Sequence, residues 1–416
     1  MAEPGLEPRR RAAAMMTAVT KDKLPLHTLE GELKGLEPSD RARAMRLASE
    51  ALRWAPRSDK VLGPFLRNKP YDNVLNLFRL ALYEINVDGV PPHAAVHAAV
   101  ALAPKQTKGL INAVLRNVQR SETDWNSLPA PALPKWLRKR LNKAWGKEAL
   151  AVMEVAHVMP APLDLSCAKD AKRWAGELGD EVLPTGSVRL AKTGQVSAMG
   201  GFDEGAWWVQ DAAAALPANL LDVKPGEQVL DLCAAPGGKT MQLAAAGADV
   251  TALDDSEDRL ERLHENLKRT GRSAKVVVAD ALQWEPSQKF DAILIDAPCS
   301  ATGTLRRHPD LAYAKDGTEL ETLLPLQAAM LDRALGWLKP DGRLVYCTCS
   351  LLPDEGEMQL EAALTRHPGL IVEDLLPEGI DKSFRASGGG LRTRPDAWSE
   401  RGGMDGFFMV RLAKPG

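Results

Sequence analysis

The most constraining feature of this sequence is the stretch from Val229 to Thr240, which has the residues VLDLCAAPGGKT. It begins as an apolar, strand-like run, turns at a Pro-Gly-Gly triplet (236–238) and continues from Lys239 into good helix formers. A strand, a glycine turn and a helix in this order open the nucleotide-binding unit of an α/β domain. The glycines let a ligand approach the backbone closely, and the start of the helix offers free N–H donors.

The chain of 416 residues is long enough for two or three domains, each with its own core. Its hydrophobic content of 45% and charged content of 26% are those of an ordinary soluble protein. No apolar run approaches membrane-spanning length, and residues 1–11 are too charged for a signal peptide. We therefore expect a cytoplasmic protein without a membrane segment.

The net charge of −2 hides an asymmetry along the chain. Residues 1–150 carry 25 Lys and Arg against 15 Asp and Glu, whereas the remainder carries 28 against 40. A basic part indicates binding to a polyanion, although solvated helix faces explain the same charge equally well. The basic segment from Lys135 to Arg140 leaves the same two interpretations open, a phosphate contact or an amphipathic surface helix.

Hydrophobic patterning predicts four parts of the chain. Residues 1–20 are expected to be disordered, and residues 21–133 show the helical spacing of an all-α domain. Residues 134–204 mix helix with short strand-like runs, which predicts linker helices and a small α/β subdomain. In residues 205–416 strands and helices alternate regularly, which predicts a doubly wound, Rossmann-like domain that binds ligands at the C-terminal ends of its strands.

Acidic residues follow successive predicted strands of this last domain. Asp254 and Asp280 stand at the ends of the two strands after the glycine turn, and Asp296 ends the next one. In this fold the first acid is placed to accept hydrogen bonds from a ribose, and the second is suited to the adenine side. A lone acid at a strand end is usually only a helix cap, so the combination with the glycine turn favours a nucleoside-bearing ligand.

Three ligand classes compete for the glycine turn. A phosphate-binding loop requires a glycine where Cys233 stands, which argues against a nucleotide triphosphatase. A dinucleotide fingerprint requires Gly-x-Gly-x-x-Gly, which the residues CAAPGG do not supply. The third class is S-adenosylmethionine, which has a ribose and an adenine but no phosphate.

The five cysteines favour this third class. They are too scattered for a disulfide scaffold, and their spacing does not fit a metal site. Cys299 and Cys349 each follow a predicted strand and would share the ligand crevice if the two strands are neighbours. A thiolate that adds to C6 of a pyrimidine makes C5 nucleophilic enough to accept a methyl group. Either cysteine alone could be a buried structural residue, but two at adjacent strand ends indicate this chemistry.

Four motifs resemble those of the Nol1/Nop2/Sun RNA cytosine-5 methyltransferases: CAAPGGK (233–239), DAPCSATG (296–303), RRHP (306–309) and YCTCS (346–350). The resemblance implies that Cys349 is the nucleophile, that Cys299 assists release of the covalent product, and that Asp296 lies near the target base. No metal site is expected. The resemblance further implies an S-adenosylmethionine site formed by Cys233, Ala234, Ala235, Pro236, Gly237, Gly238, Lys239, Asp254, Asp280 and Asp296.

The helical part resembles the RNA-binding domain of the NusB family in the segments VPPHAAVHAAV (90–100) and KGLINAVLRNV (108–118). With this domain in front, the whole chain is similar to family members that act on bacterial small-subunit rRNA. The resemblance implies methylation of C5 of a cytosine in 16S rRNA or a small-subunit precursor. Two positions depart from the family pattern, since Ala301 replaces a glycine and Gly356 an asparagine. Nothing in the chain demands more than a monomer.

Two other functions compete with this interpretation. A DNA cytosine-5 methyltransferase would use Cys299, in its Pro-Cys pair, as the nucleophile and would not need Cys349. A non-catalytic RNA-binding assembly factor would keep the cofactor fold without turnover. The presence of both thiols and of all three acids argues against the assembly factor.

Overall fold

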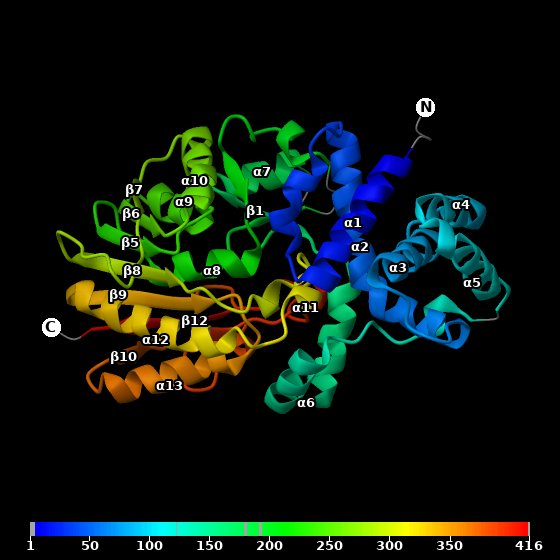
Figure 1. Ribbon diagram of the computed structural model, residues 1–416. Coiled ribbons are helices and arrows are strands. Elements are labelled where there is room, and N and C mark those ends of the chain that lie inside the picture. Colours follow the sequence, from blue (N-terminus) through cyan, green and yellow to red (C-terminus); the bar gives the residue numbers. More distant parts are fainter. Residues whose placement is uncertain (1–4, 122, 179–180, 191–193, 415–416) are drawn as a thin grey trace. The chain divides into compact units, whose positions relative to one another are not determined.

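The computed structural model describes residues 5–121, 123–178, 181–190 and 194–414. The chain divides into two compact units (Figure 1). Unit 1 comprises Met1–Met159 together with Leu305–Gly317, and unit 2 comprises Pro160–Thr304 together with Thr318–Gly416. Within the described residues, no helix has the length and hydropathy needed to cross a membrane.

Unit 1 is built from helices, as the sequence predicts (Figure 1). Helix α3 is buried on every side from Val74 to Glu84, because apolar side chains occupy nearly its whole circumference. The α-helices are α1 (Leu6–Asp22), α2 (Pro38–Leu62), α3 (Asp72–Asn86), α4 (Pro92–Leu102), α5 (Lys108–Arg120), α6 (Lys135–Val158) and α11 (Leu311–Ala314). The 3₁₀ turns are η1 (Leu26–Leu33), η2 (Gly63–Phe65), η3 (Lys105–Thr107) and η4 (Trp125–Ser127).

Helix α1 corrects the expectation of a disordered N-terminal tail. Ala12, Met15, Met16 and Val19 lie at helical spacing and are completely buried against the other helices of the unit. That expectation is therefore wrong for residues 5–20, and residues 1–4 lie outside the described chain. Of the residues that made this segment resemble a tail, Pro8 lies in the first turn of the helix and Arg10 is exposed on its outer face.

The burial of α1 is tested by Met15→Ala. Removing a completely buried methionine side chain should lower the free energy of unfolding by about 3 kcal/mol. Arg10→Ala, on the exposed face of the same helix, should change it by less than about 0.5 kcal/mol. Urea denaturation measures both, and equal stability of Met15→Ala and the wild type would contradict the docked helix.

Residues 305–317 belong to unit 1, although they were expected within the 205–416 domain. The backbone oxygen of Arg306 accepts a hydrogen bond from Arg53 Nη2 (2.6 Å), and the Tyr313 hydroxyl donates to the Leu52 oxygen (2.9 Å). Asp310 accepts a hydrogen bond from the backbone N–H of Leu26 (2.9 Å). The RRHP motif is therefore held by helices that precede it by about 250 residues, and α6 also lies in unit 1 rather than in a separate linker.

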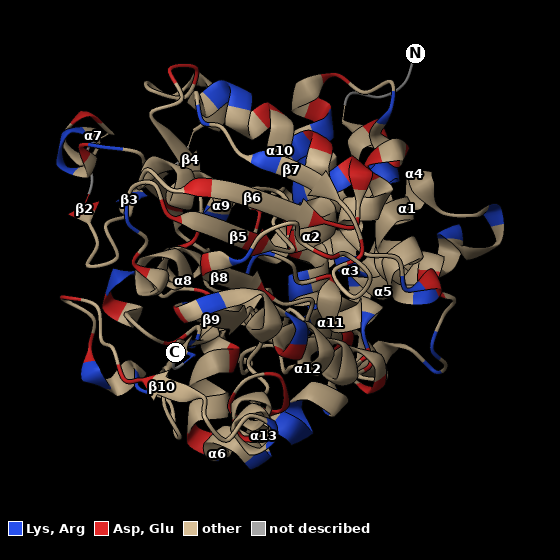
Figure 2. Ribbon diagram, turned by 90° about the vertical axis from the view of Figure 1, so that its left-hand side faces the viewer, with Lys and Arg blue, Asp and Glu red and all other residues tan. Residues whose placement is uncertain are grey.

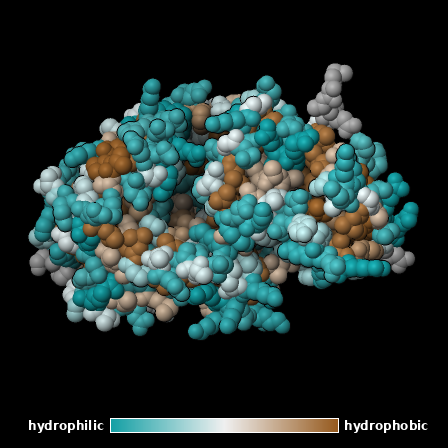
Figure 3. Space-filling model, viewed as in Figure 1, coloured by the Kyte–Doolittle hydropathy of each residue, from teal (hydrophilic) through white to brown (hydrophobic). Residues whose placement is uncertain are grey.

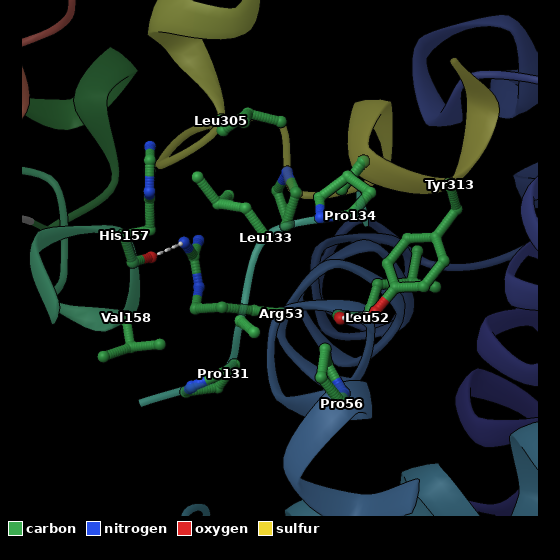
Figure 4. A pocket seen from close by; sticks show the side chains of 13 residues that line it. Leu52, Arg53, Pro56, Pro131, Leu133, Pro134, His157, Val158, Leu305 and Tyr313 are labelled. Atoms are coloured by element: carbon green, nitrogen blue, oxygen red, sulfur yellow. Dashed lines mark hydrogen bonds between the residues drawn. The ribbon is translucent and has the colours of Figure 1, made fainter. Parts of the chain in front are cut away.

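Figure 4 shows the cavity that this segment helps to form, with a volume of about 110 Å³. Its walls come from α2, from residues 131–134, from the end of α6 and from the inserted segment. His157 lines it, and burial together with the charges of Arg306 and Arg53 lowers the pKa of His157 to about 3. This histidine is therefore neutral at physiological pH and serves as a packing residue.

Unit 2 contains a small sheet with the strand order β2-β3-β1-β4, in which each pair is antiparallel. Helix α7 packs on it, which agrees with the predicted α/β subdomain. The subdomain extends to residue 209, because the segment expected to open the last domain supplies β4. The elements are β1 (Leu163–Cys167), α7 (Ala171–Leu178), β2 (Glu181–Val182), β3 (Val188–Leu190), η5 (Val196–Ala198) and β4 (Trp207–Val209).

The large sheet has the order β10-β12-β9-β8-β5-β6-β7, with β11 paired to β12. The strands from β9 to β7 are parallel, so their C-terminal ends share one edge, whereas β12 runs antiparallel to β9. Strands β8 and β9 are neighbours, which was the condition for Cys299 and Cys349 to share the ligand crevice. The strands are β5 (Gln228–Leu232), β6 (Asp249–Asp254), β7 (Lys275–Val278), β8 (Phe290–Asp296), β9 (Leu338–Thr348), β10 (Ile371–Glu373), β11 (Leu391–Arg392) and β12 (Phe408–Ala413).

Helices cover both faces of this sheet, which confirms the doubly wound class (Figure 1). Val229 packs with Leu216 of α8 on one face, and Leu230 packs with Met330 of α12 on the other, as strand alternation requires. The helices are α8 (Ala212–Leu221), α9 (Gly238–Ala245), α10 (Glu257–Thr270), α12 (Leu320–Trp337) and α13 (Glu357–Arg366). The 3₁₀ turns are η6 (Thr302–Thr304), η7 (Pro353–Glu355), η8 (Lys382–Phe384) and η9 (Ser399–Arg401).

Surface helices bury their apolar face and expose their polar face. Helix α10 buries its leucines and exposes charges of both signs, which are coloured in Figure 2. Hydrophilic residues cover most of the face in Figure 3.

Candidate active site

The glycine turn forms where β5 ends and α9 begins. Within the turn, the backbone N–H of Gly237 donates to the Ala234 oxygen (2.8 Å). The N–H of Ala234 donates to the Leu253 oxygen of β6 (3.1 Å). Gly237 has a φ of 103°, a conformation in which a residue with a Cβ would be strained. The turn is thus held to the neighbouring strand and presents backbone at the C-terminal edge of the sheet.

Asp254, at the end of β6, anchors the turn from the side. Its Oδ2 accepts a hydrogen bond from Ala235 N (3.1 Å), and its Oδ1 accepts one from Ser256 N (3.2 Å). Arg259 of α10 lies 3.5 Å from Asp254 and donates to the Ala235 oxygen (2.7 Å). Arg259 was not predicted, because nothing in its helical context distinguishes it from a surface arginine.

Asp280 follows β7, the next strand of the sheet, and is exposed. Its described hydrogen bonds are local, from Leu282 N (2.8 Å) and from the Gln283 amide (2.9 Å). The structure therefore places it at the same edge as Asp254 but without a direct contact to the glycine turn. Both acids remain predicted cofactor contacts.

Lys239 and Asp296 form an ion pair between α9 and the end of β8. Lys239 Nζ donates to Asp296 Oδ2 at 2.7 Å, and the lysine side chain is nearly buried while the aspartate is 32% exposed. Burial opposes the lysine charge, but Asp296 more than compensates and raises the pKa of Lys239. The ammonium also lies 5.4 Å from the ring centre of Phe407, a residue that sequence reasoning missed.

Cys299 and Cys349 meet at the carboxyl ends of β8 and β9. Their sulfur atoms are 3.4 Å apart, although 50 residues separate them in the chain. The hydrogen bond with Cys349, burial and the charge of Cys349 raise the pKa of Cys299 well above its usual value. The raised pKa favours the protonated form of Cys299, and at this distance its S–H is within hydrogen-bond reach of the Cys349 sulfur.

The other two thiols of this edge do not join that pair. Cys347 is completely buried, and its Sγ donates to Asp296 Oδ1 at 3.5 Å. Burial and the charge of Asp296 raise the pKa of Cys347, so it stays a thiol. Cys233 lies inside the glycine turn, where burial followed by the charges of Asp254 and Asp296 raises its pKa in the same way.

The sequence of this chain matches two family models. Residues 218–413 match the model described as 16S rRNA methyltransferase RsmB/F, and residues 6–120 match the NusB family. A ribosomal RNA small subunit methyltransferase B from Pseudomonas syringae pv. tomato is 35% identical over 98% of this chain and 97% of its own length. The protein of that name from Escherichia coli is 39% identical over 81% of each chain.

The chain belongs to the 16S rRNA methyltransferase RsmB/F family. A methyltransferase homologue from Pyrococcus horikoshii of known crystal structure is 27% identical, covers 66% of this chain and 93% of its own, and has a TM-score of 0.57. NSun6 from Pyrococcus horikoshii, solved with SFG, has a TM-score of 0.60 at 21% identity over 68% of this chain and 99% of its own, which shows a shared fold.

The cofactor of this family member is S-adenosylmethionine. The residues present suit it, because Gly237 and Gly238 leave backbone free of side chains and acids end two successive strands. No phosphate-binding lysine is available, since Lys239 is paired with Asp296. Among the described residues, no group of three or more His, Cys, Asp or Glu side chains is placed to hold a metal ion.

Gly356, where the resemblance led us to expect an asparagine, lies in a crowded position. A Cβ at this position would lie 2.7 Å from Phe408 Cγ and 2.6 Å from Arg392 Nη2. Arg392 fills the available space, where it donates to the Ser350 oxygen and pairs with Glu357 (2.6 Å). The glycine therefore makes room for an arginine that holds the residue after Cys349.

Ala301, where the resemblance led us to expect a glycine, has a φ of 55°, and this left-handed conformation costs stability for a residue with a Cβ. Ala301→Gly should raise the free energy of unfolding by about 1 kcal/mol, since glycine adopts this conformation without the Cβ clash. Ala362→Gly, at an exposed position of α13, should lower it by about 1 kcal/mol. Urea titrations that give both glycine variants the same sign would contradict the strained turn.

The buried Asp231 on β5 makes the free energy of unfolding depend on pH, which can be tested. It is fully buried, and burial raises its pKa to about 7 although Thr240 Oγ1 donates to it at 2.6 Å. Between about pH 4 and pH 7 the folded protein keeps a proton that the unfolded chain has released, so stability falls as the pH rises. Asp231→Asn cannot titrate and should gain up to about 4 kcal/mol relative to the wild type across that window. A stability difference that is independent of pH would contradict the buried neutral acid.

Proposed function

We propose that this chain methylates C5 of a cytosine in 16S rRNA or a small-subunit precursor, with S-adenosylmethionine as donor and Cys349 as nucleophile. The observation that carries the proposal is the pair of thiols 3.4 Å apart at the ends of adjacent parallel strands. The ion pair of Lys239 with Asp296 lies at the same edge of the sheet. A buried structural pair would not need this position beside a cofactor turn.

Cys349 begins the reaction as a thiolate. A free thiol is only a few per cent ionised at neutral pH, and the S–H of Cys299 stabilises the anion by hydrogen bonding. The Cys349 sulfur bonds to C6, and C5 becomes the nucleophile. The bound cofactor supplies the methyl group. Loss of the C5 proton to a base and cleavage of the S–C6 bond then restore the aromatic ring and free Cys349, with Cys299 assisting this release.

Asp296 and Lys239 suit the recognition of cytosine. The partly exposed carboxylate of Asp296 can accept a hydrogen bond from the exocyclic amine, which uracil lacks. Lys239 remains protonated because its pKa is raised, so it places a positive charge beside Asp296 and near the ring, where charge develops. Both residues are carried by the sheet and by α9, so they are positioned before the base arrives.

Binding of RNA is assigned to the basic N-terminal part, which has the match to the NusB family. The excess of Lys and Arg in residues 1–150 would make this binding weaken as salt rises. The target base has to leave its stack to reach the thiols, at a cost of a few kcal/mol that is lowest in an unpaired segment. A monomer in the cytoplasm is sufficient for all of these steps.

Alanine variants of the two thiols test the nucleophile. With 16S rRNA and labelled S-adenosylmethionine, Cys349→Ala should lose methyl transfer completely, because no thiolate adds to C6. Cys299→Ala should accumulate a covalent protein–RNA adduct, because the product is released slowly. Cys167→Ala, in the small sheet of unit 2, should behave like the wild type.

The outcomes separate the competing functions. An adduct that persists in Cys349→Ala would overturn the nucleophile assignment, and an enzyme that requires Cys299 alone and prefers DNA would be a DNA methyltransferase. A wild-type protein that binds RNA but transfers no methyl group would be an assembly factor. Bisulfite sequencing or mass spectrometry of the product identifies C5 of cytosine as the modified atom.

A further inference from the structure

A buried carboxylate that the reaction above does not use holds the turn beside Cys299. Glu355 lies in η7 and has no exposed surface. Its Oε1 accepts hydrogen bonds from Ser300 N (2.8 Å) and from Gln327 Nε2 (3.1 Å). Its Oε2 accepts one from the Ser300 hydroxyl. Three donors therefore converge on one side chain, and two of them belong to the residue that follows Cys299.

The backbone of the same residue holds the other thiol's strand. The Glu355 oxygen accepts hydrogen bonds from the Tyr346 hydroxyl (3.0 Å) and from Thr348 Oγ1 (3.2 Å). Both donors lie on β9, which leads directly into Cys349. Glu355 thus contacts the chain beside both sulfur atoms. Its carboxylate binds Ser300, next to Cys299, and its backbone carbonyl binds β9, which leads to Cys349.

Gln327 of α12 extends this contact to the residue before Cys299. Its Nε2 donates to the Pro298 oxygen at 2.8 Å as well as to Glu355. The turn that carries Cys299 is consequently held at Pro298 and at Ser300, on both sides of the sulfur. The backbone that carries Cys299 therefore cannot move away from Cys349 without breaking hydrogen bonds to buried side chains.

A buried carboxylate at the position of Glu355 costs folding free energy. The described hydrogen-bond donors to its carboxylate are a backbone N–H, a hydroxyl and an amide, all of them uncharged. Burial of a carboxylate with neutral donors carries a desolvation penalty that an apolar or amide side chain would avoid. After the Cys349 hydrogen bond, burial and the charge of Cys349, the charge of Glu355 is a further cause of the raised pKa of Cys299.

We propose that Glu355 is a positioning residue for Cys299, which fixes the turn at Ser300 and keeps the second thiol against Cys349 during release of the product. The proposal rests on the proposed function for the release step, but the geometry of the thiol pair can be tested without RNA. Because Glu355 has no exposed surface, it acts through Ser300 and Gln327.

Glu355→Gln is the variant that tests it. The amide offers one acceptor oxygen in place of two, so one of the donors at Ser300 or Gln327 loses its partner. Steady-state methyl transfer to 16S rRNA should fall about tenfold, the effect of losing a hydrogen bond to a charged group. The first turnover should fall less than about twofold, because Cys349 still adds to C6. The covalent protein–RNA adduct should accumulate, as in Cys299→Ala.

A second readout does not involve RNA. Alkylation of Cys299 by iodoacetamide, followed by peptide mass spectrometry over a range of pH, reports the ionisation of this thiol. In Glu355→Gln the alkylation profile of Cys299 should move to lower pH, because a negative charge beside the thiol is removed. The Cys167 peptide is the internal reference, and Glu361→Gln, exposed on α13, is the matched charge control that should behave like the wild type.

Ser300→Ala keeps the proposal testable if Glu355→Gln unfolds. It removes the hydroxyl bond to Oε2 and leaves the N–H bond to Oε1, so a smaller accumulation of adduct is expected. Wild-type turnover and adduct levels in these variants would overturn the proposal. Equal losses in the first and later turnovers, with an unchanged alkylation profile, would also overturn it. If Cys349→Ala still forms the adduct, the proposed function fails instead, while the alkylation result continues to decide the role of Glu355.

Discussion

The parallel pairing of β8 with β9, beside β5 and β6, is the constraint on which the site depends. Parallel strands end at one edge of a sheet, so the side chains that follow them converge although they are far apart in the chain. Asp296 is in register with Cys347, and the turns just beyond bring Cys299 to within 3.4 Å of Cys349. Helices on both faces keep this edge in place.

Residues of the same type at this edge differ in their electrostatic surroundings. Asp296 accepts a hydrogen bond from Lys239 at 2.7 Å, whereas burial raises the pKa of Asp231 to about 7. Cys299, Cys347 and Cys233 all have raised pKa values, with the neighbouring thiol as the largest cause for the first and burial for the other two. The assignment of Cys349 as nucleophile therefore agrees with the protonated state of the thiols around it.

Unit 1 shows how a helical domain can hold a motif from the other part of the chain. The chain leaves unit 2 after Thr304, only five residues beyond Cys299, and returns at Thr318. In between, Arg306 and Tyr313 make hydrogen bonds with α2. The family motif RRHP thus belongs structurally to the domain that matches the NusB family, while the motif before it belongs to the methyltransferase unit.

The sequence alone determined the doubly wound class and the glycine turn, because strand alternation and turn residues are local signals. It placed Cys299 and Cys349 at strand ends, but only the parallel pairing of β8 with β9 brings their sulfur atoms to within 3.4 Å. It misjudged residues 5–20, where the helical spacing of the buried residues was overlooked in favour of the charged ones. It also misjudged the boundary near residue 133 and the place of residues 305–317, since docking against distant helices leaves little local pattern. Only the tertiary structure revealed Arg259, Phe407 and the network of Glu355, all of which act across elements. Long-range packing decides such contacts, and the residue types alone do not specify them.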